Sequence, residues 1–260
     1  MMNLEQSVSI PPVTIIIPAY NEELRIKGVL DEISNFVSRN NVDWDLIVSV
    51  DGDDGTEDIV RRYSSVHPFI KLDKGVERGG KGYAIKRVVN YSKGEFTLIM
   101  DADGSVKLDD IVSNIHYLTD YDVLLFDRYS SPENSIPIRR RFPSRVFNVL
   151  VRAFLKVNVK DTQCGYKIIR TSIAKEAFKS ITVTNAFFDV ALLYYIKKMG
   201  GKIKEIGTKY SHDEDSKFNV LLLIVGEGIS LLAFLIRHSR LYKYVPEWAK
   251  QLYVRKFKWI

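Results

Sequence analysis

This 260-residue chain lacks several features that would assign its class directly. Its single cysteine, Cys164, excludes an internal disulfide and a cysteine cage for a metal, which suits a reducing compartment. Residues 1–12 lack the apolar core of a signal peptide, so we expect no export. Only 15 glycines and 8 prolines occur in a chain that is 46% hydrophobic, which argues against disorder and predicts a sizeable core.

A glycine-rich nucleotide-binding loop is missing as well. Nucleotide-binding sheets often place a Gly-x-Gly-x-x-Gly or Walker loop directly after the first strand. Here the apolar strand expected at Val13–Ile17 is followed by Pro-Ala-Tyr-Asn-Glu-Glu at positions 18–23. A nucleotidyltransferase is therefore disfavoured.

Most of the chain has no net positive charge. The sequence carries 38 Lys and Arg against 32 Asp and Glu, a net charge of +6. Residues 237–260 contain seven basic residues and one acid, so this segment holds the whole excess and residues 1–236 sum to zero. Aromatic residues alternate with these cations, a composition suited to lipid headgroups. RNA could use the same mixture, but no nucleic-acid-binding fold accompanies it, so we expect no nucleic-acid partner.

The apolar run Val220–Ile236 is short for a membrane span. As a helix it would extend about 25 Å against the ~30 Å of a bilayer core, and Glu227 would lie near mid-depth. A span, an interfacial helix, a re-entrant hairpin broken at Gly226 and Gly228, and an oligomer contact all stay open. We expect residues 218–260 to be a helical appendage that associates with a membrane surface, and a homo-oligomer is an alternative use of the same segment.

Residues 13–126 alternate between strand and helix patterns. Apolar runs without polar alternation predict buried parallel strands. The expected strands are Val13–Ile17, Asp45–Val50, Ile70–Leu72, Phe96–Met100 and Val123–Phe126. The expected helices run from an Asn21 cap to about Arg39 and over Gly55–Ser64, Gly80–Tyr91 and Leu108–Leu118. This alternation predicts an α/β fold with a mostly parallel central sheet flanked by helices.

Two carboxylates follow one of these strands. Asp101 and Asp103 come directly after Phe96–Met100, at the sheet edge where open α/β folds bind ligands. A divalent cation carrying a diphosphate would neutralise them, and Mg²⁺ or Mn²⁺ suits oxygen ligands. An Asp-rich surface turn would have the same sequence, so the motif needs support from the rest of the chain.

Two further side chains fit such a ligand. Lys81 lies in a glycine-flanked loop at a predicted helix N-terminus, where it can meet a phosphate or a sugar. A solvated lysine beside a helix cap would look the same. Asp51 ends the second strand and can accept a hydrogen bond from a base or ribose, or form an Asx turn.

Four motifs in this order resemble glycosyltransferase family 2, whose members have the GT-A fold. They are Val13-Thr-Ile-Ile-Ile-Pro-Ala-Tyr-Asn-Glu-Glu, the acidic turn Asp51–Thr56, the loop Gly79–Gly82 and Asp101-Ala102-Asp103. Downstream, Asp161–Lys167, Phe188–Val190 and Ser216–Lys217 resemble the subgroup that glycosylates dolichyl or polyprenyl phosphate. Within that subgroup, Gly104-Ser105 after the second Asp is closer to the dolichyl-phosphate glucose synthases than to the mannose synthases.

Three positions depart from the subgroup pattern. The acidic turn has an extra Gly52, so the sequence does not say which of Asp53 and Asp54 is its second acid. Ala191 stands where the subgroup often has Glu, and Tyr210 where Trp often precedes His212 by two residues. None removes a metal ligand, but the last two leave the acceptor side less defined.

The resemblance implies a role for each matching residue. The nucleotide-sugar donor would be held by Pro18, Ala19, Tyr20, Glu22, Asp51, Asp53, Lys81, Asp101 and Ala102. The metal ligands would be Asp101 and Asp103, and the catalytic residues Asp103, Asp189 and Lys81. The acceptor phosphate would be held by Arg128, Arg140 and Ser144. The sugar pocket would contain Asp161, Gln163, Lys167, His212 and Lys217.

Physical chemistry bears on several of these roles. Asp189 begins an apolar segment and would also serve as an ordinary helix N-terminal charge. The family's matching acid is often drawn as a base, but a phosphate with a second pKa of about 6 is largely ionised near neutrality, so an orienting role is also open. Three arginines at 139–141 are unfavourable at a helix start, which favours phosphate binding over solvation. Cys164 is expected to be a packed small residue and not a nucleophile.

We therefore expect an inverting glycosyltransferase, with a catalytic domain over 1–217, at the cytoplasmic face of a membrane as a peripheral or monotopic protein. It would transfer a hexose, with UDP-glucose favoured, to dolichyl or polyprenyl phosphate by single displacement with a divalent metal. A GDP-mannose donor and another acceptor are alternatives, and so is a non-catalytic sugar-nucleotide-binding scaffold. The metal motif, Lys81 and Asp189 favour the enzyme.

Overall fold

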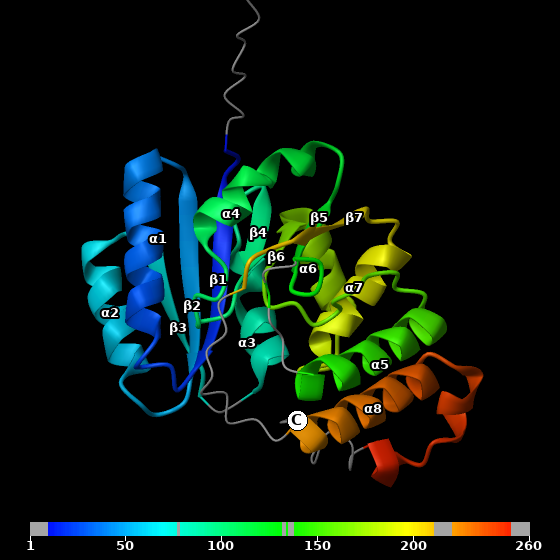
Figure 1. The fold of residues 1–260 in the computed structure, drawn as a ribbon. Coiled ribbons are helices and arrows are strands. Elements are labelled where there is room, and N and C mark those ends of the chain that lie inside the picture. The colour runs from blue at the N-terminus through cyan, green and yellow to red at the C-terminus, as the bar shows by residue number, and fades with distance from the viewer. Residues whose placement is uncertain (1–9, 77–78, 132–133, 135–137, 211–219, 251–260) are drawn as a thin grey trace, which may run out of the picture.

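A seven-stranded sheet in the order β3-β2-β1-β4-β6-β5-β7 forms the centre of the protein (Figure 1). The computed structural model describes residues 10–76, 79–131, 134, 138–210 and 220–250, and of 138–143, 220–225 and 241 only the backbone. The strands are β1 (Val13–Tyr20), β2 (Trp44–Asp51), β3 (Ile70–Lys74), β4 (Phe96–Ile99), β5 (Val123–Asp127), β6 (Lys167–Arg170) and β7 (Ile203–Gly207). The α-helices are α1 (Ile26–Asn40), α2 (Thr56–Val66), α3 (Lys81–Val88), α4 (Leu108–Ser113), α5 (Ile138–Leu155), α6 (Thr171–Ser180), α7 (Phe188–Lys198) and α8 (Val220–Arg237). Short 3-10 helices are η1 (Val89–Tyr91), η2 (Ile115–Thr119) and η3 (Arg240–Tyr244).

The sheet is mostly parallel, which confirms the predicted fold class. β1 pairs in parallel with β2 and β4, β2 with β3, and β5 with β7. The exception is β6, which runs antiparallel between β4 and β5. The sequence does not predict β6, because periodicity cannot identify a run of four residues inside a segment assigned to a ligand loop.

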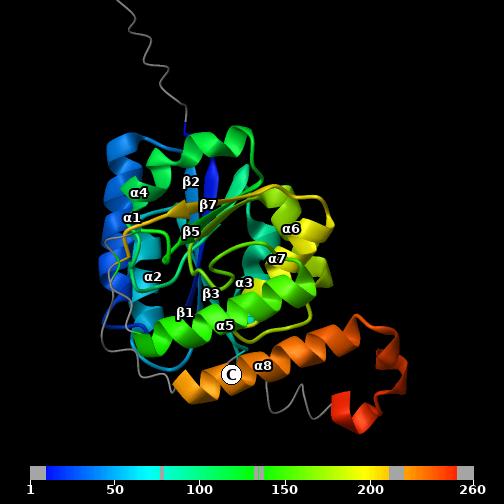
Figure 2. The ribbon, with the colours of Figure 1, turned by 45° about the vertical axis from the view of Figure 1, so that its right-hand side comes forward.

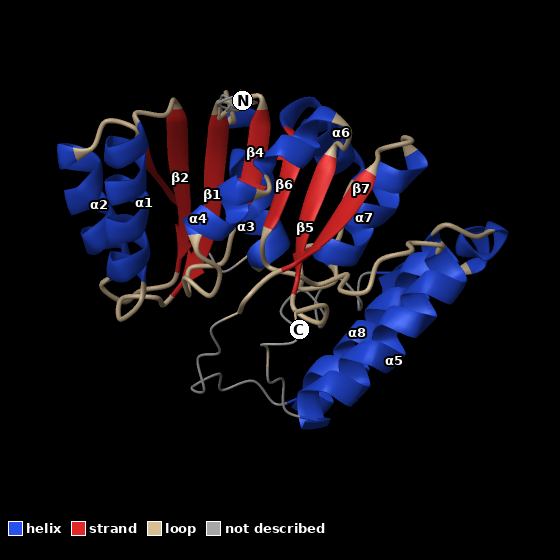
Figure 3. Cartoon of the chain, turned by 45° about the horizontal axis from the view of Figure 1, so that its top comes forward, coloured by secondary structure: helices blue, strands red, loops and turns tan. Residues whose placement is uncertain are grey.

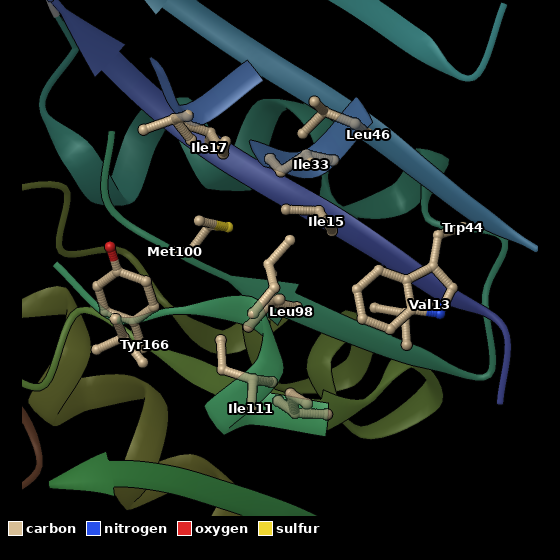
Figure 4. Close-up of a cluster of buried hydrophobic side chains, with 14 of the residues drawn as sticks. Val13, Ile15, Ile17, Ile33, Trp44, Leu46, Leu98, Met100, Ile111 and Tyr166 are labelled. Carbon is tan, nitrogen blue, oxygen red and sulfur yellow. The ribbon is translucent and has the colours of Figure 1, made fainter. Parts of the chain in front are cut away.

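Both faces of the sheet are covered by helices, and successive strand residues face two different cores. Ile15 of β1 packs with Ile33 of α1 and Leu98 of β4, a cluster that Figure 4 shows in part. The next residue, Ile16, belongs to the opposite core together with Ile85 of α3. Helices α1 and α2 thus cover one face, and α3, α6 and α7 the other (Figure 2). A strand buried on both faces has no polar alternation, which is why β1 reads as a continuous apolar run.

Three local predictions are wrong in their limits. β1 does not stop at Pro18 but continues to Tyr20, because its pairing with β4 ends at Ile16 and the proline has only β2 as a neighbour. Asn21 does not cap α1; it has a φ of 55° in the connecting turn, and α1 follows Arg25. The helix expected over residues 108–118 is divided into α4 and η2.

Helix α8 lies beside α5 along the lower edge of the sheet (Figure 3). It is continuous through Gly226 and Gly228, so the hairpin alternative is wrong. Its side chains Leu231 and Phe234 are buried in the core formed by α5 and α7. In the part of the chain that the structure describes, no helix is long and apolar enough to cross a membrane. The division of the chain at residue 217 stays a prediction.

Candidate active site

The carboxyl ends of β1, β2 and β4 meet at one edge of the sheet because the three strands are parallel. Tyr20 at the end of β1 is aligned with Asp51 at the end of β2. Asp101 and Asp103 follow β4 at the same edge. The polar residues that the sequence places after different strands are therefore brought together, as expected for ligand binding at strand ends.

A chain of four alternating charges begins at the first of these acids. Lys81 Nζ, at the start of α3, lies 2.5 Å from Asp101 Oδ1 and 4.0 Å from Asp189 Oδ2 at the start of α7. Lys167 Nζ lies 2.5 Å from Asp189 Oδ1 and is completely buried. Two residues assigned to catalysis, one to the metal and one to the sugar pocket thus form a single network. Lys81 is held in ion pairs and is not a solvated helix-cap lysine.

The pKa values of Lys81 and Asp101 favour their charged forms. Burial lowers the pKa of Lys81, but the carboxylates of Asp101 and Asp189 outweigh burial and raise it above its usual value. Burial raises the pKa of Asp101, yet the charge of Lys81 and its hydrogen bond lower it overall. Lys81 is therefore a fixed cation at neutral pH and is unsuited to act as a general base.

Asp103 is oriented by two donors. The Tyr166 hydroxyl and the Ser105 backbone N–H each donate to Asp103 Oδ1 at 3.0 Å. Burial and the nearby charges of Asp103 and Asp101 raise the pKa of Tyr166, so this phenol stays protonated and continues to donate. Tyr166 belongs to the Asp161–Lys167 motif, but the sequence assigned it no role.

The donor set at this point fits a hard divalent cation. The pKa of Glu22 is raised, mainly by burial. The pairing with Arg25 opposes this shift, and the nearby charges of Asp103 and Asp101 add to it. Among the described residues, no group of three or more His, Cys, Asp or Glu side chains forms a complete protein metal site. Mg²⁺ is commonly held by one or two carboxylates together with substrate phosphates, and Asp101 and Asp103 suit that arrangement.

The glycine at position 165 is required by this geometry. A Cβ atom there would collide with the carboxylate of Asp101. Any other residue at Gly165 would therefore displace the acid that pairs with Lys81.

Asp51 is buried and held from two sides. Arg87 Nη1 of α3 donates to its Oδ1 at 3.1 Å, and the Gly79 backbone N–H donates to its Oδ2 at 3.1 Å. Arg87 also binds Asp73 and Ser49, so it ties α3 to the ends of β2 and β3. No sequence motif pointed to Arg87, because only folding brings α3 against β2.

The two candidate acids of the following turn differ in their contacts. Asp54 accepts hydrogen bonds from Thr56 and from the Glu23 backbone N–H. Asp53 has an exposed side chain, and its backbone N–H donates to Asn21 Oδ1 at 3.2 Å. Asp54 is therefore engaged in building the turn, and Asp53 is the acid left at the surface.

Arg128 and Asp161 form a bidentate pair, although the sequence assigned them to different ligands. Arg128 Nε and Nη2 lie 2.6 and 2.9 Å from the two oxygens of Asp161. The rings of Tyr129 and Tyr210 lie 5.7 and 5.8 Å from the guanidinium carbon. Ser144 interacts with Tyr129, which brings it to the same region.

The remaining assigned residues vary in their exposure. Ala19 and Ala102 are buried, Pro18 and Gln163 are half-buried, and Tyr20 is exposed. His212 and Lys217 lie outside the described residues, as does the side chain of Arg140 within α5.

Two other positions have structural roles. Cys164 is completely buried, and its thiol donates a hydrogen bond to the Phe126 carbonyl. Burial raises the pKa of this thiol to about 12. It is a packed residue, as predicted. Ala191 is completely buried in the core around α7.

Comparison with known proteins identifies the class. The family model Glycosyl transferase family 2 matches residues 14–178, more than half of the chain. The chain therefore belongs to glycosyltransferase family 2, which confirms the expected family and the expectation of a glycosyltransferase.

Individual relatives agree with this family. A dolichyl-phosphate beta-glucosyltransferase of Dictyostelium discoideum is 28% identical over 224 residues, which are 79% of this chain and 68% of that protein. Glucosyl-3-phosphoglycerate synthase of Mycobacterium tuberculosis, solved with Mn²⁺, UDP and glucosyl-3-phosphoglycerate, has a TM-score of 0.64 at 16% identity and covers 87% of this chain and 79% of its own. The mannosyltransferase PcManGT of Pyrobaculum calidifontis, solved with GDP-Man and Mn²⁺, has a TM-score of 0.61 at 19% identity. The match covers 90% of this chain and 66% of the PcManGT chain. These structures confirm the fold.

Proposed function

We propose that this glycosyltransferase transfers a hexose, preferably glucose from UDP-glucose, to the phosphate of a dolichyl or polyprenyl chain with inversion. The observation that carries the proposal is the charge network Asp101–Lys81–Asp189–Lys167 at the carboxyl edge of the sheet. Family membership supplies the reaction class, and the dolichyl-phosphate beta-glucosyltransferase of Dictyostelium discoideum supports the donor and the acceptor.

The donor would bind across the ends of β1, β2 and β4. Asp51, fixed by Arg87, would accept a hydrogen bond from the base or ribose, and the exposed Asp53 would lie beside it. Asp103 and Asp101 would hold Mg²⁺ or Mn²⁺ together with the diphosphate oxygens. The bound metal would supply Lewis-acid stabilisation of the leaving diphosphate. The two solved neighbours that contain Mn²⁺ support this choice of cation.

Lys81 would act on the donor as a fixed positive charge. Its ammonium group lies between Asp101 and Asp189, so it would stand where the diphosphate side and the sugar side of the proposed site meet. A cation preorganised there would stabilise charge that develops on the leaving oxygens without needing to move.

Asp189 would orient the reactants and not remove a proton. One of its oxygens is bound to the buried Lys167, and this ion pair fixes the direction of the carboxylate. A phosphate acceptor near neutral pH needs no base, since its second pKa is about 6. Its attacking oxygen needs to be aimed at the sugar, and a rigid ion pair serves that purpose.

The acceptor phosphate would bind near Arg128 and Ser144, with Arg140 as the further cation. Asp161 occupies the Nε and Nη2 side of Arg128 and thereby fixes the plane of the guanidinium. Its Nη1 edge would then be presented to the phosphate in a defined direction. Gln163, Lys167, His212 and Lys217 would line the sugar side.

The lipid chain would approach along α5 and α8. Helix α5 exposes Val146, Val149, Leu150 and Phe154, and α8 beside it exposes Leu232. Together with the basic and aromatic residues beyond Arg237, these side chains would contact the cytoplasmic surface of a membrane without spanning it.

The test uses the full-length protein with polyprenyl phosphate and either labelled UDP-glucose or labelled GDP-mannose. Label should enter the chloroform phase with UDP-glucose, and chelation should stop it. Preferential use of GDP-mannose would show that the donor is GDP-mannose and not UDP-glucose. The mannosyltransferase among the structural neighbours, solved with GDP-Man, is the reason for including this donor. Nucleotide-sugar binding without transfer to any lipid phosphate would favour a non-catalytic scaffold.

A further inference from the structure

Glu227 is a buried carboxyl group on the otherwise apolar helix α8. It is 6% exposed, and its Oε2 atom has no hydrogen-bond partner among the residues that the structure describes. A buried polar atom without a partner costs folding free energy, so a helix that only covered the core would carry an apolar residue here. The position therefore calls for an explanation other than packing.

The carboxyl group faces the candidate active site. Burial, and then the charge of Asp189, raise the pKa of Glu227 to about 8, while the side chain of Gln163 opposes this shift. Both neighbours belong to the segments assigned to catalysis and to the sugar pocket. At neutral pH Glu227 is protonated and can donate a hydrogen bond as well as accept one, which the ionised acids of the site cannot do.

A second contact fixes α8 against the same segment. Ser230 lies three residues after Glu227 on the same helix face and is 1% exposed. Asn185 Nδ2 donates to Ser230 Oγ at 3.0 Å, while Asn185 Oδ1 accepts from the Phe187 backbone N–H at 3.1 Å. This turn leads directly into α7, whose first turn carries Asp189. Helix α8 is thus attached to the segment that positions the catalytic acid.

The charges around Glu227 are few. Asp189 of α7 is the charged side chain that acts on it among the described residues, and Asp189 is itself paired with Lys167. Helix α5 contributes the apolar Phe147 and Val151 to the core it shares with α8, and the side chains of its residues 138–143 lie outside the described set. Ionisation of Glu227 would add a negative charge beside Asp189 in a site with little solvent.

We propose that Glu227 is a positioning residue of the transfer site: its buried carboxyl group, supplied by the C-terminal helix, holds Asp189 and Gln163 in place. Helix α8 is then part of the active site and not only a membrane contact. The inference rests on the proposed function for the reaction that it serves, but the contact between α8 and Asp189 does not depend on the identity of the substrates.

The test compares Glu227→Gln, Glu227→Ala and Ser230→Ala in the full-length protein, with kcat measured across the pH range around 8. In the wild type, kcat should fall as Glu227 ionises. Glu227→Gln mimics the protonated acid, so it should keep most of the neutral activity and lose this alkaline fall. Glu227→Ala should lower kcat about tenfold or more at every pH, with little change in the KM for the nucleotide sugar.

Ser230→Ala is the matched control on the same helix face. It should lower the melting temperature but keep the wild-type pH profile, because it removes a structural contact only. An alkaline fall that persists in Glu227→Gln, or a wild-type kcat in Glu227→Ala, would overturn the proposal.

The outcome stays separable from that of the proposed function. If the wild type transfers sugar to no lipid phosphate, the proposed function fails. The same three variants are then compared by hydrolysis of the nucleotide sugar, where Glu227 should affect the pH profile in the same way. If the pH profile of hydrolysis is identical in the wild type and all three variants, the proposal for Glu227 is wrong whatever the acceptor is.

Discussion

The strand-edge region of the site and its helical region are built in different ways. At the strand edge, Asp51, Asp101 and Asp103 are held by hydrogen bonds and ion pairs from neighbouring loops and from α3. In the helical region, α5 and α8 are held mainly by apolar packing, and their buried polar residues include Asn148, Glu227 and Ser230.

This difference matches two different tasks, because the strand edge would bind the metal and the diphosphate and the helices would contact the lipid. At the strand edge, Asp51 and Asp101 are paired with the cations Arg87 and Lys81, and Asp103 accepts hydrogen bonds from neutral donors, so the three acids are held in fixed positions as a site for a metal and a diphosphate requires. Helices held by apolar side chains can expose a lipid-facing surface on the other side, where α5 presents Val149 and Phe154. In our proposal, Glu227 is the residue of the second region that acts on the first.

The largest effect is expected from Asp103→Ala at the strand edge. Transfer should fall by at least about 10³-fold, equivalent to about 4 kcal/mol of transition-state free energy, because the metal loses a ligand. The melting temperature should change little, since Asp103 is only half-buried. The exposed acid Asp110 on α4 provides the control, and Asp110→Ala should be fully active. Undiminished transfer by Asp103→Ala, or in excess chelator, would remove the metal from the mechanism.

In the helical region, Phe234→Ala should act on stability. Phe234 is 3% exposed and contacts Phe187 and Tyr194, with ring centroids 5.4 and 5.2 Å away. Truncation leaves a cavity, so the free energy of unfolding should fall by about 3–5 kcal/mol. Chemical denaturation measures this change, and Leu232→Ala on the exposed side of the same helix should cost much less. Equal losses for the two variants would show that α8 is not docked as described.

The boundary between the two regions is tested by Arg128→Ala. This change removes a cation beside the proposed acceptor phosphate and leaves the buried Asp161 unpaired. We expect the KM for lipid phosphate to rise about tenfold to a hundredfold, with a smaller change for the nucleotide sugar. Initial rates with each substrate varied in turn measure both constants, and the exposed Arg62→Ala is the control. Loss of donor affinity alone would move Arg128 to the strand-edge region.

A further effect in the helical region is the pH dependence of stability in Glu227→Gln. The folded-state pKa of Glu227 is raised to about 8 from 4.5, so the folded protein binds one proton more than the unfolded chain between these values. The contribution of Glu227 to stability is therefore complete below pH 4.5 and is lost as the pH rises to about 8. Relative to the wild type, Glu227→Gln should gain stability over this interval. Denaturation curves at several pH values measure the difference, and a constant difference would contradict the raised pKa.

Much of the strand-edge region was predictable from the sequence. Continuous apolar runs identify doubly covered strands, and the carboxyl ends of parallel strands must share one edge, so Asp51, Asp101 and Asp103 were expected to converge. Lys81 was placed there by the glycines that surround it. The alternation of strands and helices predicted the sheet itself.

The tertiary structure alone decided the partners of these groups. Arg87 reaches Asp51, Tyr166 reaches Asp103, and Lys167 reaches Asp189, over sequence separations of 36, 63 and 22 residues. No local pattern encodes such contacts, because they depend on which elements pack together after folding. The surroundings of Glu227 are likewise decided by folding. In the sequence it is an isolated charge in an apolar run, and only the packing of α8 beside α7 gives it neighbours. The sequence determined which chemical groups stand at the strand ends, since local periodicity decides where strands begin and end. The packing of distant segments decided which of those groups are paired, buried and held in position.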